Sequence, residues 1–285
     1  MAAAGGRAPS AEPASPLGIT YIGHATLLLD FGGTRLLTDP NFDPQLGGIL
    51  PRVSPPGIAA ELLPRLHAIL LTHAHADHLS FTSLDALPRD IPLYAPPVVA
   101  RWLQRRGYRH AEPLAPGAVA HVGDVRVVAE AARHQGARYG VDRWRGDANF
   151  YLLERASGAS AFFAGDTGLT PKARDLVRGR LGLGARMLDV ALLPIGHAPW
   201  WKPGFRKGHL TAQDALALFA ELEARYFIPY HWGTFHHLSA GAFDAIVRLR
   251  ALLRNHAAAH AVRVLEPGSA FQVDTPPGVP PVVDR

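Results

Sequence analysis

The stretch LTHAHADHLS, residues 71–80, places three histidines and one aspartate within six positions, directly after an apolar run that predicts a strand. In a loop at a strand end, alternate residues can point to the same side, so His73 and His75 can share one cation. The adjacent Asp77 and His78 then turn toward a second cation. A histidine-rich surface loop would explain any one of these residues, but not the whole H-x-H-x-D-H spacing. We therefore predict half of a two-metal site here.

The other half must use nitrogen and oxygen ligands, because the chain contains no cysteine. Three positions have a suitable residue at or just after the end of a predicted strand, where functional side chains are common. They are His134 in AARHQG, Asp166 in FFAGDTG and His231 in IPYHWGTF. Each position by itself is a weak indication. A site built only from nitrogen and oxygen accommodates zinc, manganese or iron.

Strands and helices are mixed through both halves of the chain, which places the protein in the α/β class. Residues 19–31 and 34–39 predict a β-hairpin, because Gly32 and Gly33 supply the positive φ angles of a two-residue turn. Further strands are predicted at 67–72, 91–95, 124–131, 149–156, 160–166, 189–196 and 226–232, with a final strand pair at 262–267 and 270–273. Helices are predicted between Ser80 and Pro88, and at 98–106, 171–179, 212–224 and 242–255, the fourth with capping-box spacing of Thr211 and Asp214.

The composition favours one folded domain at 18–285, since 285 residues with 48% hydrophobic content can bury a large core. Residues 1–17 are rich in small residues and proline, and Glu12 interrupts any signal-peptide core, so we predict a disordered tail. No apolar run is long enough to span a membrane, and we expect a cytoplasmic protein. The formal charge of +5 is scattered, and the arginine-rich stretch 101–110 is interpreted as a solvated helix surface, so no nucleic-acid partner is expected.

The motif and its three distant partners resemble the metallo-β-lactamase superfamily, in which H-x-H-x-D-H is followed by a histidine, a bridging aspartate and a late histidine. The resemblance runs from Ile19 to Val273. The phrases YIGHATLLLDF, LLTDP, FAGDTG and PYHWGTF are similar to the branch that contains N-acyl-phosphatidylethanolamine phospholipase D and ascorbate-6-phosphate lactonase. The resemblance implies a four-layer αβ/βα sandwich, with two mixed sheets flanked by helices and the metals in a cleft at one edge.

Carried over position by position, the resemblance implies two divalent metal ions, with zinc first and manganese or iron as alternatives. The implied ligands are His73, His75 and His134 for one ion, Asp77, His78 and His231 for the other, and Asp166 as the bridge. Two cations roughly 3.5–4 Å apart can hold a bridging hydroxide and polarise the oxygen under attack. Asp77 could also orient that water or move its proton. Asp39 matches an early family aspartate, for which we expect a hydrogen bond that orients a ligand.

Two further histidines lie near this predicted site. His24, in a GHAT turn similar to a recurring family turn, either lines the cleft or is hydrogen-bonded within the fold, and the sequence does not favour one over the other. His209 directly precedes the Thr211 helix cap, where a helix N-terminus could receive an anionic or oxyanionic group. For His209 we favour a catalytic role in the cleft over plain capping.

The segment 197–209, HAPWWKPGFRKGH, has two equally weighted interpretations. In the first it is a substrate wall, in which Trp200 and Trp201 contact an apolar group while Lys202, Arg206 or Lys207 meets an anion. In the second the aromatic pair pins a long loop to the body of the protein. The segment 138–149 could form the opposite wall.

The leading interpretation is a dinuclear metal-dependent hydrolase acting on a phosphodiester or related phosphoester, with a lactonase as the alternative. Its substrate would be a small or lipid-like anionic molecule. A β-lactamase is less favoured because no export signal is present. A flavodiiron oxidoreductase would need a carboxylate at position 75 and a flavin domain. A non-catalytic metal-binding protein would be expected to have lost ligands, whereas all seven are present.

Overall fold

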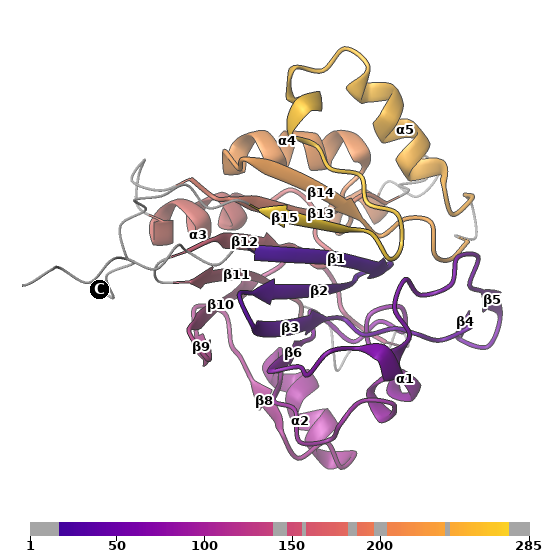
Figure 1. Ribbon diagram of the computed structural model, residues 1–285, viewed down its shortest axis with the longest axis vertical. Coiled ribbons are helices and arrows are strands. Elements are labelled where there is room, and N and C mark those ends of the chain that lie inside the picture. Colours follow the sequence, from indigo (N-terminus) through magenta and orange to yellow (C-terminus); the bar gives the residue numbers. More distant parts are fainter. Residues whose placement is uncertain are drawn as a thin grey trace, which may run out of the picture.

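The computed structural model of the chain describes residues 17–138, 147–155, 158–181, 187–196, 204–236 and 240–273, and its core is a pair of mixed β-sheets (Figure 1). The first sheet runs in the order β15 (Ala270–Val273), β1 (Leu17–Gly23), β2 (Thr26–Phe31), β3 (Thr34–Thr38), β6 (Ala68–Leu70), β7 (Leu93–Ala95) and β8 (Ala111–Pro113). The second runs in the order β14 (Tyr226–Tyr230), β13 (Val190–Pro194), β12 (Ser160–Phe163), β11 (Asn149–Arg155), β10 (Val125–Ala131) and β9 (Val119–Val122). A small separate hairpin is formed by β4 (Gln45–Leu46) and β5 (Leu50–Pro51).

The inner strands β2, β3, β6 and β7 of the first sheet send alternate side chains into two different apolar cores, as the period of two along a strand requires. In β2, Leu27 and Leu29 belong to a large cluster that also contains residues of the second sheet. Leu28, between them, belongs to a smaller cluster with Leu84 and Val99 from the helices on the opposite face. Strands with apolar residues at consecutive positions are therefore buried on both faces.

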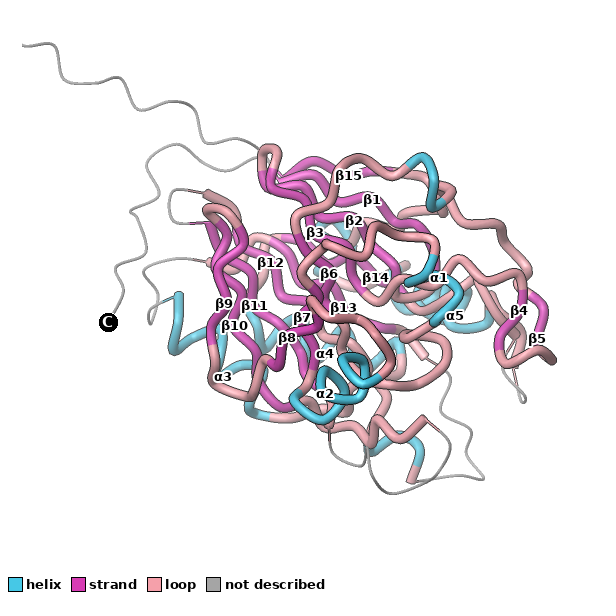
Figure 2. Tube along the Cα trace, turned by 90° about the horizontal axis from the view of Figure 1, so that it is seen from below, coloured by secondary structure: helices cyan, strands magenta, loops and turns pink. Residues whose placement is uncertain are grey.

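Helices cover the outer faces of both sheets and complete four layers (Figure 1). They are α1 (Phe81–Asp85) and α2 (Pro97–Arg105) on the first sheet, and α3 (Pro171–Leu181), α4 (Ala212–Leu222) and α5 (Asp244–Leu253) on the side of the second. Figure 2 shows the strands of the two sheets stacked through the body, with the β4–β5 hairpin projecting at one end. The predicted four-layer arrangement is confirmed. Among the described residues, no helix combines the length and apolar character that crossing a membrane would need.

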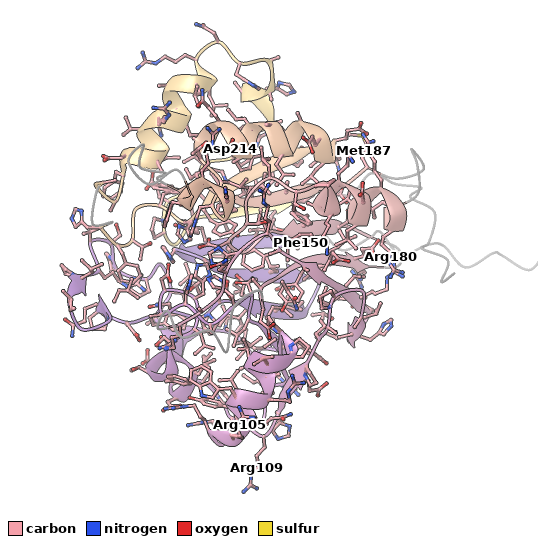
Figure 3. All side chains as sticks on the ribbon, turned by 180° about the vertical axis from the view of Figure 1, so that it is seen from behind. Arg105, Arg109, Phe150, Arg180, Met187 and Asp214 are labelled. Atoms are coloured by element: carbon pink, nitrogen blue, oxygen red, sulfur yellow. The ribbon has the colours of Figure 1, made fainter. Side chains whose placement is uncertain are left out.

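Local helix signals are also confirmed. The Ser80 hydroxyl accepts a hydrogen bond from the Ser83 N–H at the start of α1, so Ser80 is the N-cap. Thr211 and Asp214 form a reciprocal capping box at the start of α4. In the rear view of Figure 3, Arg105 and Arg109 lie at the end of the molecule opposite α4, whereas Phe150 lies inside it.

Residues 19–31, predicted as one strand, instead form two antiparallel strands, β1 and β2. The chain reverses at Gly23 and His24, whose φ angles are +145° and +54°. Glycine adopts such angles readily, and a histidine there is held by its surroundings. The extra turn is important because it places His24 at the end of the sheet instead of within it.

Two predictions about the chain ends are wrong. Leu17, assigned to the tail, is fully buried and pairs with Val273 as the first residue of β1. Residues 262–267 do not pair with 270–273, because only Val262 forms a bridge, to Phe227, and β15 pairs with β1. Gly268, with φ of +90°, donates its N–H to Tyr21 O and turns the chain onto the open edge of the first sheet.

Candidate metal centre

Ligand-type side chains from both sheets gather at the C-terminal ends of parallel or co-directional strands. His73 follows β6, His134 follows β10, Asp166 follows β12 and His231 follows β14. The strand order brings these ends to one edge, as the sequence predicts from their positions after strands. Functional residues far apart in the chain therefore become neighbours.

The side chains form two groups, each with ligand atoms within 4.8 Å of one another. The first group consists of His73, His75, His134 and Asp166, and the second of His24, Asp77, His78 and His231. All seven predicted ligand positions thus come together, and the structure adds His24. Either group has the nitrogen and oxygen donors that a divalent cation needs.

The Asp166 carboxylate lies between the two groups. Although it belongs to the first, its Oδ1 is 3.3 Å from His231 Nε2 and its Oδ2 is 3.5 Å from His78 Nε2. Asp166 is therefore a member of the first group whose two oxygens also lie close to nitrogen atoms of the second group. This is the position that a bridging ligand would occupy.

Asp39 fixes the ring orientation of one histidine from each group. Its Oδ2 accepts from His78 Nδ1–H at 2.8 Å and from the Thr72 hydroxyl at 2.6 Å. Because that hydroxyl proton points to Asp39, the oxygen of Thr72 accepts from His73 Nδ1–H, at 3.0 Å. Both histidines therefore turn Nε2 toward the centre. These hydrogen bonds are compatible with the ligand-orienting role that we predict for Asp39.

Buried His73 Nε2 has no hydrogen-bond partner among the described residues. An unpaired polar atom in a fully buried side chain is costly, and native structures rarely keep one without a use. With its Nδ1 proton directed to Thr72, the lone pair of Nε2 points into the first group. The residues thus fit a bound cation.

The segment before α4 orients two more histidines. His134 Nδ1–H donates to Gly208 O at 2.8 Å, and His209 Nδ1–H donates to Phe205 O at 2.9 Å. A carbonyl oxygen can only accept, so the Nε2 atoms of both rings are directed toward other partners. His209 Nε2 lies 3.5 Å from Asp166 Oδ2, beside the two groups instead of within either. Its predicted cleft position is compatible with this geometry.

His24 both lines the cleft and is hydrogen-bonded, so the two interpretations of it are not exclusive. Its Nε2 is 2.9 Å from Asp77 Oδ2, and its backbone carbonyl accepts from His231 N–H. Among the described residues only four non-glycine residues have positive φ, and His24, Asp39 and His231 are three of them, at +54°, +34° and +70°. Unfavourable backbone angles gathered at one place are typical of a functional site.

The electrostatics favour the metal-binding forms of most of these residues. Burial lowers the pKa of His73 well below its ordinary value of 6.5, that of His134 to about 3 and that of His24 to about 4. Burial alone would raise the pKa of Asp166, but nearby histidines, led by His231, hold it well below the ordinary 3.8. His78 is the exception, because surrounding carboxylates overcome the effect of burial and raise its pKa well above 6.5.

These shifts predict a pH-dependent stability for protein stripped of metal by a chelator. For His134 and His24 the folded-state pKa is below the unfolded one, so between pH 6.5 and 4 the unfolded chain binds more protons. The free energy of unfolding should therefore fall as pH falls, by about 1.4 kcal/mol per pH unit for each histidine. The stabilisation from His78, whose folded pKa is raised, is complete below pH 6.5 and does not oppose this slope. Urea unfolding at several pH values measures this slope of unfolding free energy against pH. His121→Asn, which replaces an exposed histidine, is the control. A slope that His134→Asn leaves unchanged would contradict the lowered pKa assigned to His134.

The structure assigns a different partner to one predicted substrate residue. Arg206, expected to meet an anion, pairs in a bidentate manner with Asp214, at 2.6 and 2.9 Å, and so supports the α4 cap. Lys207 lies on the cavity beside His134 and His209. Trp200, Trp201 and Lys202 lie outside the described residues.

Sequence reasoning missed the residues that orient the ligands through backbone groups. Arg138 donates to Ala74 O and Leu79 O, at 3.1 and 2.6 Å, and so holds both flanks of the H-x-H-x-D-H loop. Gly208 orients His134 through its carbonyl, and Thr72 connects His73 to Asp39. Only Thr72 carried a usable signal, as a polar residue at the end of an apolar strand.

Comparison with known proteins agrees with the metal-binding character of the site geometry. The family model "Beta-lactamase superfamily domain" matches residues 34–232. The chain is 28% identical over 265 residues to a protein of Azorhizobium caulinodans named a metal-dependent hydrolase, which covers 90% of this chain and 99% of that protein. It is 29% identical over 232 residues to the N-acyl-phosphatidylethanolamine-hydrolyzing phospholipase D of Saccharomyces cerevisiae, over 77% of this chain and 48% of that protein.

Among solved structures, a possible metal-dependent hydrolase from Veillonella parvula superimposes with a TM-score of 0.73 at 19% identity, covering 90% of this chain and 99% of that one. At this identity the likeness concerns the fold, which has the same two-sheet architecture. The match of the family model over most of the chain decides the classification. The chain belongs to the metallo-β-lactamase superfamily and has the metallo-β-lactamase fold.

Proposed function

We propose that the protein is a dinuclear metal-dependent hydrolase that cleaves a phosphodiester or a related phosphoester. The observation that carries this proposal is the buried, unpartnered His73 Nε2 in a group that shares Asp166 with a second group. The name of the yeast relative, a phospholipase D, supports the substrate class. Lactone hydrolysis is the alternative, in keeping with the resemblance to a lactonase branch.

In this proposal His73, His75 and His134 hold one cation, Asp77, His78 and His231 hold the other, and Asp166 bridges them. Bound there, two divalent cations, zinc first, would lower the pKa of a water toward neutrality and polarise the oxygen under attack. His24 hydrogen-bonds Asp77, which limits the directions in which that carboxylate can reach a cation or a water.

The side chains around the cations supply the proton transfers. Nearby histidines hold the pKa of Asp77 well below its ordinary value against the opposing effect of burial, so the carboxylate is ionised and can orient the attacking water or move its proton. His209 keeps its Nδ1–H on Phe205 O and presents Nε2 to the reacting centre, so in its imidazolium form, with the second proton on Nε2, it donates that proton to the leaving oxygen. No serine or lysine nucleophile is required.

The test is a metal analysis followed by a substrate screen. Purified protein should contain close to two equivalents of zinc, manganese or iron, measured by inductively coupled plasma mass spectrometry. The loaded protein should hydrolyse phosphodiesters in a panel that also contains phosphotriesters, lactones and β-lactams. Hydrolysis of lactones alone would select the alternative. Absence of bound metal together with no hydrolysis after reconstitution would exclude the enzyme proposal.

Asp39→Asn should weaken metal binding without removing a ligand. The carboxylate accepts three hydrogen bonds, from His78 Nδ1–H and the Thr72 hydroxyl at Oδ2 and from Thr72 N–H at Oδ1. An amide would set its NH2 group against one of these donors, so the rings of His78 and His73 lose their fixed orientation. We expect roughly a 10–100-fold loss of metal affinity, measured by competition with a chromophoric chelator. Asp43→Asn is the matched control, because the Asp43 carboxylate accepts from the Ser80 and Ser83 hydroxyls, outside the centre. Equal affinities in the two variants would contradict the orienting role.

A further inference from the structure

Two cavities of opposite character meet at the candidate centre. The apolar cavity has a volume of about 330 Å³ and the cationic cavity about 540 Å³. His75, Phe205 and His209 line both of them. Ligand sites of enzymes fall in this size range. A substrate bound at the centre can therefore extend in two directions that differ chemically.

The apolar cavity is walled by side chains from three separate segments. Leu46 and Leu50 come from the β4–β5 hairpin, Phe235 follows β14, and Ala245 belongs to α5. The metal-centre residues Asp77, Asp166 and His231 form its inner end. Among the described residues that line it, there is no lysine or arginine. Apart from His236, the side chains that line it away from the metal-centre residues and His209 are apolar, so the cavity suits an apolar group that extends away from the cations.

The cationic cavity lies on the other side of His75. Its described lining contains Arg133, Lys207 and Gln135 together with His134 and His209, and no aspartate or glutamate. Lys207 is exposed, so its ammonium group can approach a ligand without losing much hydration. A cavity of one charge sign attracts the opposite charge. It is suited to a carboxylate or phosphate.

His209 stands at the boundary between the two cavities. Its ring stacks on Phe205 with a centroid distance of 3.9 Å and an interplanar angle of 4°. The hydrogen bond from Nδ1–H to Phe205 O fixes the ring further, with Nε2 3.5 Å from Asp166 Oδ2. A proton from Nε2 is therefore delivered at the junction of the cavities.

We propose that the substrate is amphiphilic, with an apolar group in the apolar cavity and an anionic leaving group in the cationic cavity. This inference rests on the proposed hydrolase function. The water oxygen bonds to phosphorus, or to the carbonyl carbon of an ester. The bond to the leaving oxygen breaks on the Lys207 side, and that oxygen takes the proton from His209. Ala245 and Lys207 then determine specificity for the two halves.

The probes are alkyl 4-nitrophenyl phosphodiesters with methyl, butyl or hexyl groups, each with and without a carboxylate on the nitrophenyl ring. With zinc-loaded wild-type protein, kcat/KM should rise roughly fourfold per buried methylene. The ring carboxylate should raise it about 10-fold or more, since hydrogen bonds to charged groups are strong. Alkyl 4-nitrophenyl carboxylic esters replace these probes if the screen selects ester hydrolysis.

Two variants test separately how the protein recognises the anionic half and the apolar half of the substrate. Lys207→Glu should remove the preference for the ring carboxylate and keep the chain-length gain, while Lys207→Arg keeps both. Ala245→Phe should remove the chain-length gain and keep the carboxylate preference. Arg109→Glu, at the far end of the molecule (Figure 3), makes the same charge change away from the site and should change neither.

Binding of the product supplies a readout independent of turnover. Carboxylated 4-nitrophenol should bind wild-type protein at least about 10-fold more tightly than it binds Lys207→Glu, measured by calorimetry. If wild-type protein hydrolyses the probes but Lys207→Glu lowers kcat/KM equally for charged and uncharged leaving groups, the orientation is refuted. If no probe is hydrolysed but the product binds with this difference, the hydrolase function fails while the anion-binding cavity stands.

Discussion

Asp166→Asn is expected to lower kcat/KM of the metal-loaded protein by more than about 100-fold and to leave one of the two metal equivalents weakly bound. The reason is that Asp166 belongs to the group of His73, His75 and His134, while its two oxygens also lie 3.3 and 3.5 Å from the Nε2 atoms of His231 and His78 in the second group. An amide offers one neutral oxygen and one N–H group, so it cannot bridge two cations. Loss of a residue that only orients a ligand already costs 10–100-fold, and loss of a shared ligand should cost more.

The fold of this variant should be retained, because asparagine has nearly the same shape and Asp166 makes no contribution to the apolar clusters. Far-ultraviolet circular dichroism and mass-spectrometric metal counting distinguish loss of the site from loss of the fold. Asp175→Asn, an exposed carboxylate on α3 paired with Arg174, is the matched control and should keep both metals and full activity. Full activity of Asp166→Asn would refute the bridging assignment.

The gathering of the predicted ligand residues could be expected from the sequence on two grounds. His73, His75, Asp77 and His78 belong to one loop, whereas His134, Asp166 and His231 were indicated by their residue types at strand ends and by the family resemblance, and the strand order brings those ends to the loop. The consecutive apolar residues along β2 likewise indicate a strand buried on both faces. These features follow from spacing in the chain.

Features that depend on tertiary contacts could not be predicted. The relay from His73 through Thr72 to Asp39 joins positions 33 residues apart and needs the parallel pairing of β3 with β6. Arg206 was assigned to an anion because its partner, Asp214, was identified only as a helix cap. One wall of the apolar cavity is formed by the β4–β5 hairpin, whose two-residue strands are too short for any periodicity to indicate. The spacing of residues in the sequence indicates which residues can have a functional role, but not which side chains they contact in the folded protein.

Gly168→Ala should cost on the order of 2–3 kcal/mol of unfolding free energy and lower activity roughly 100-fold. A Cβ at Gly168 would lie 2.1 Å from Lys207 O and 2.7 Å from Lys207 C, which are backbone atoms and cannot rotate away. The backbone around 207 must therefore move. That movement carries Gly208, whose carbonyl orients His134, and His209, whose Nε2 faces Asp166. One methyl group in the D-T-G turn thus disturbs a predicted ligand and the predicted proton donor together.

The matched control is Gly179→Ala in the last turns of α3, where an added Cβ meets nothing within 4 Å. The same chemical change should there raise the free energy of unfolding by about 0.5–1 kcal/mol, because alanine loses less conformational entropy in a helix. Urea unfolding measures both changes in unfolding free energy, the decrease in Gly168→Ala and the increase in Gly179→Ala. The activity loss of Gly168→Ala should appear mainly in kcat, since the ligand atoms remain and only their geometry changes. A Gly168→Ala protein with normal stability and kcat would show that the contact between the D-T-G turn and residue 207 does not hold the site in place.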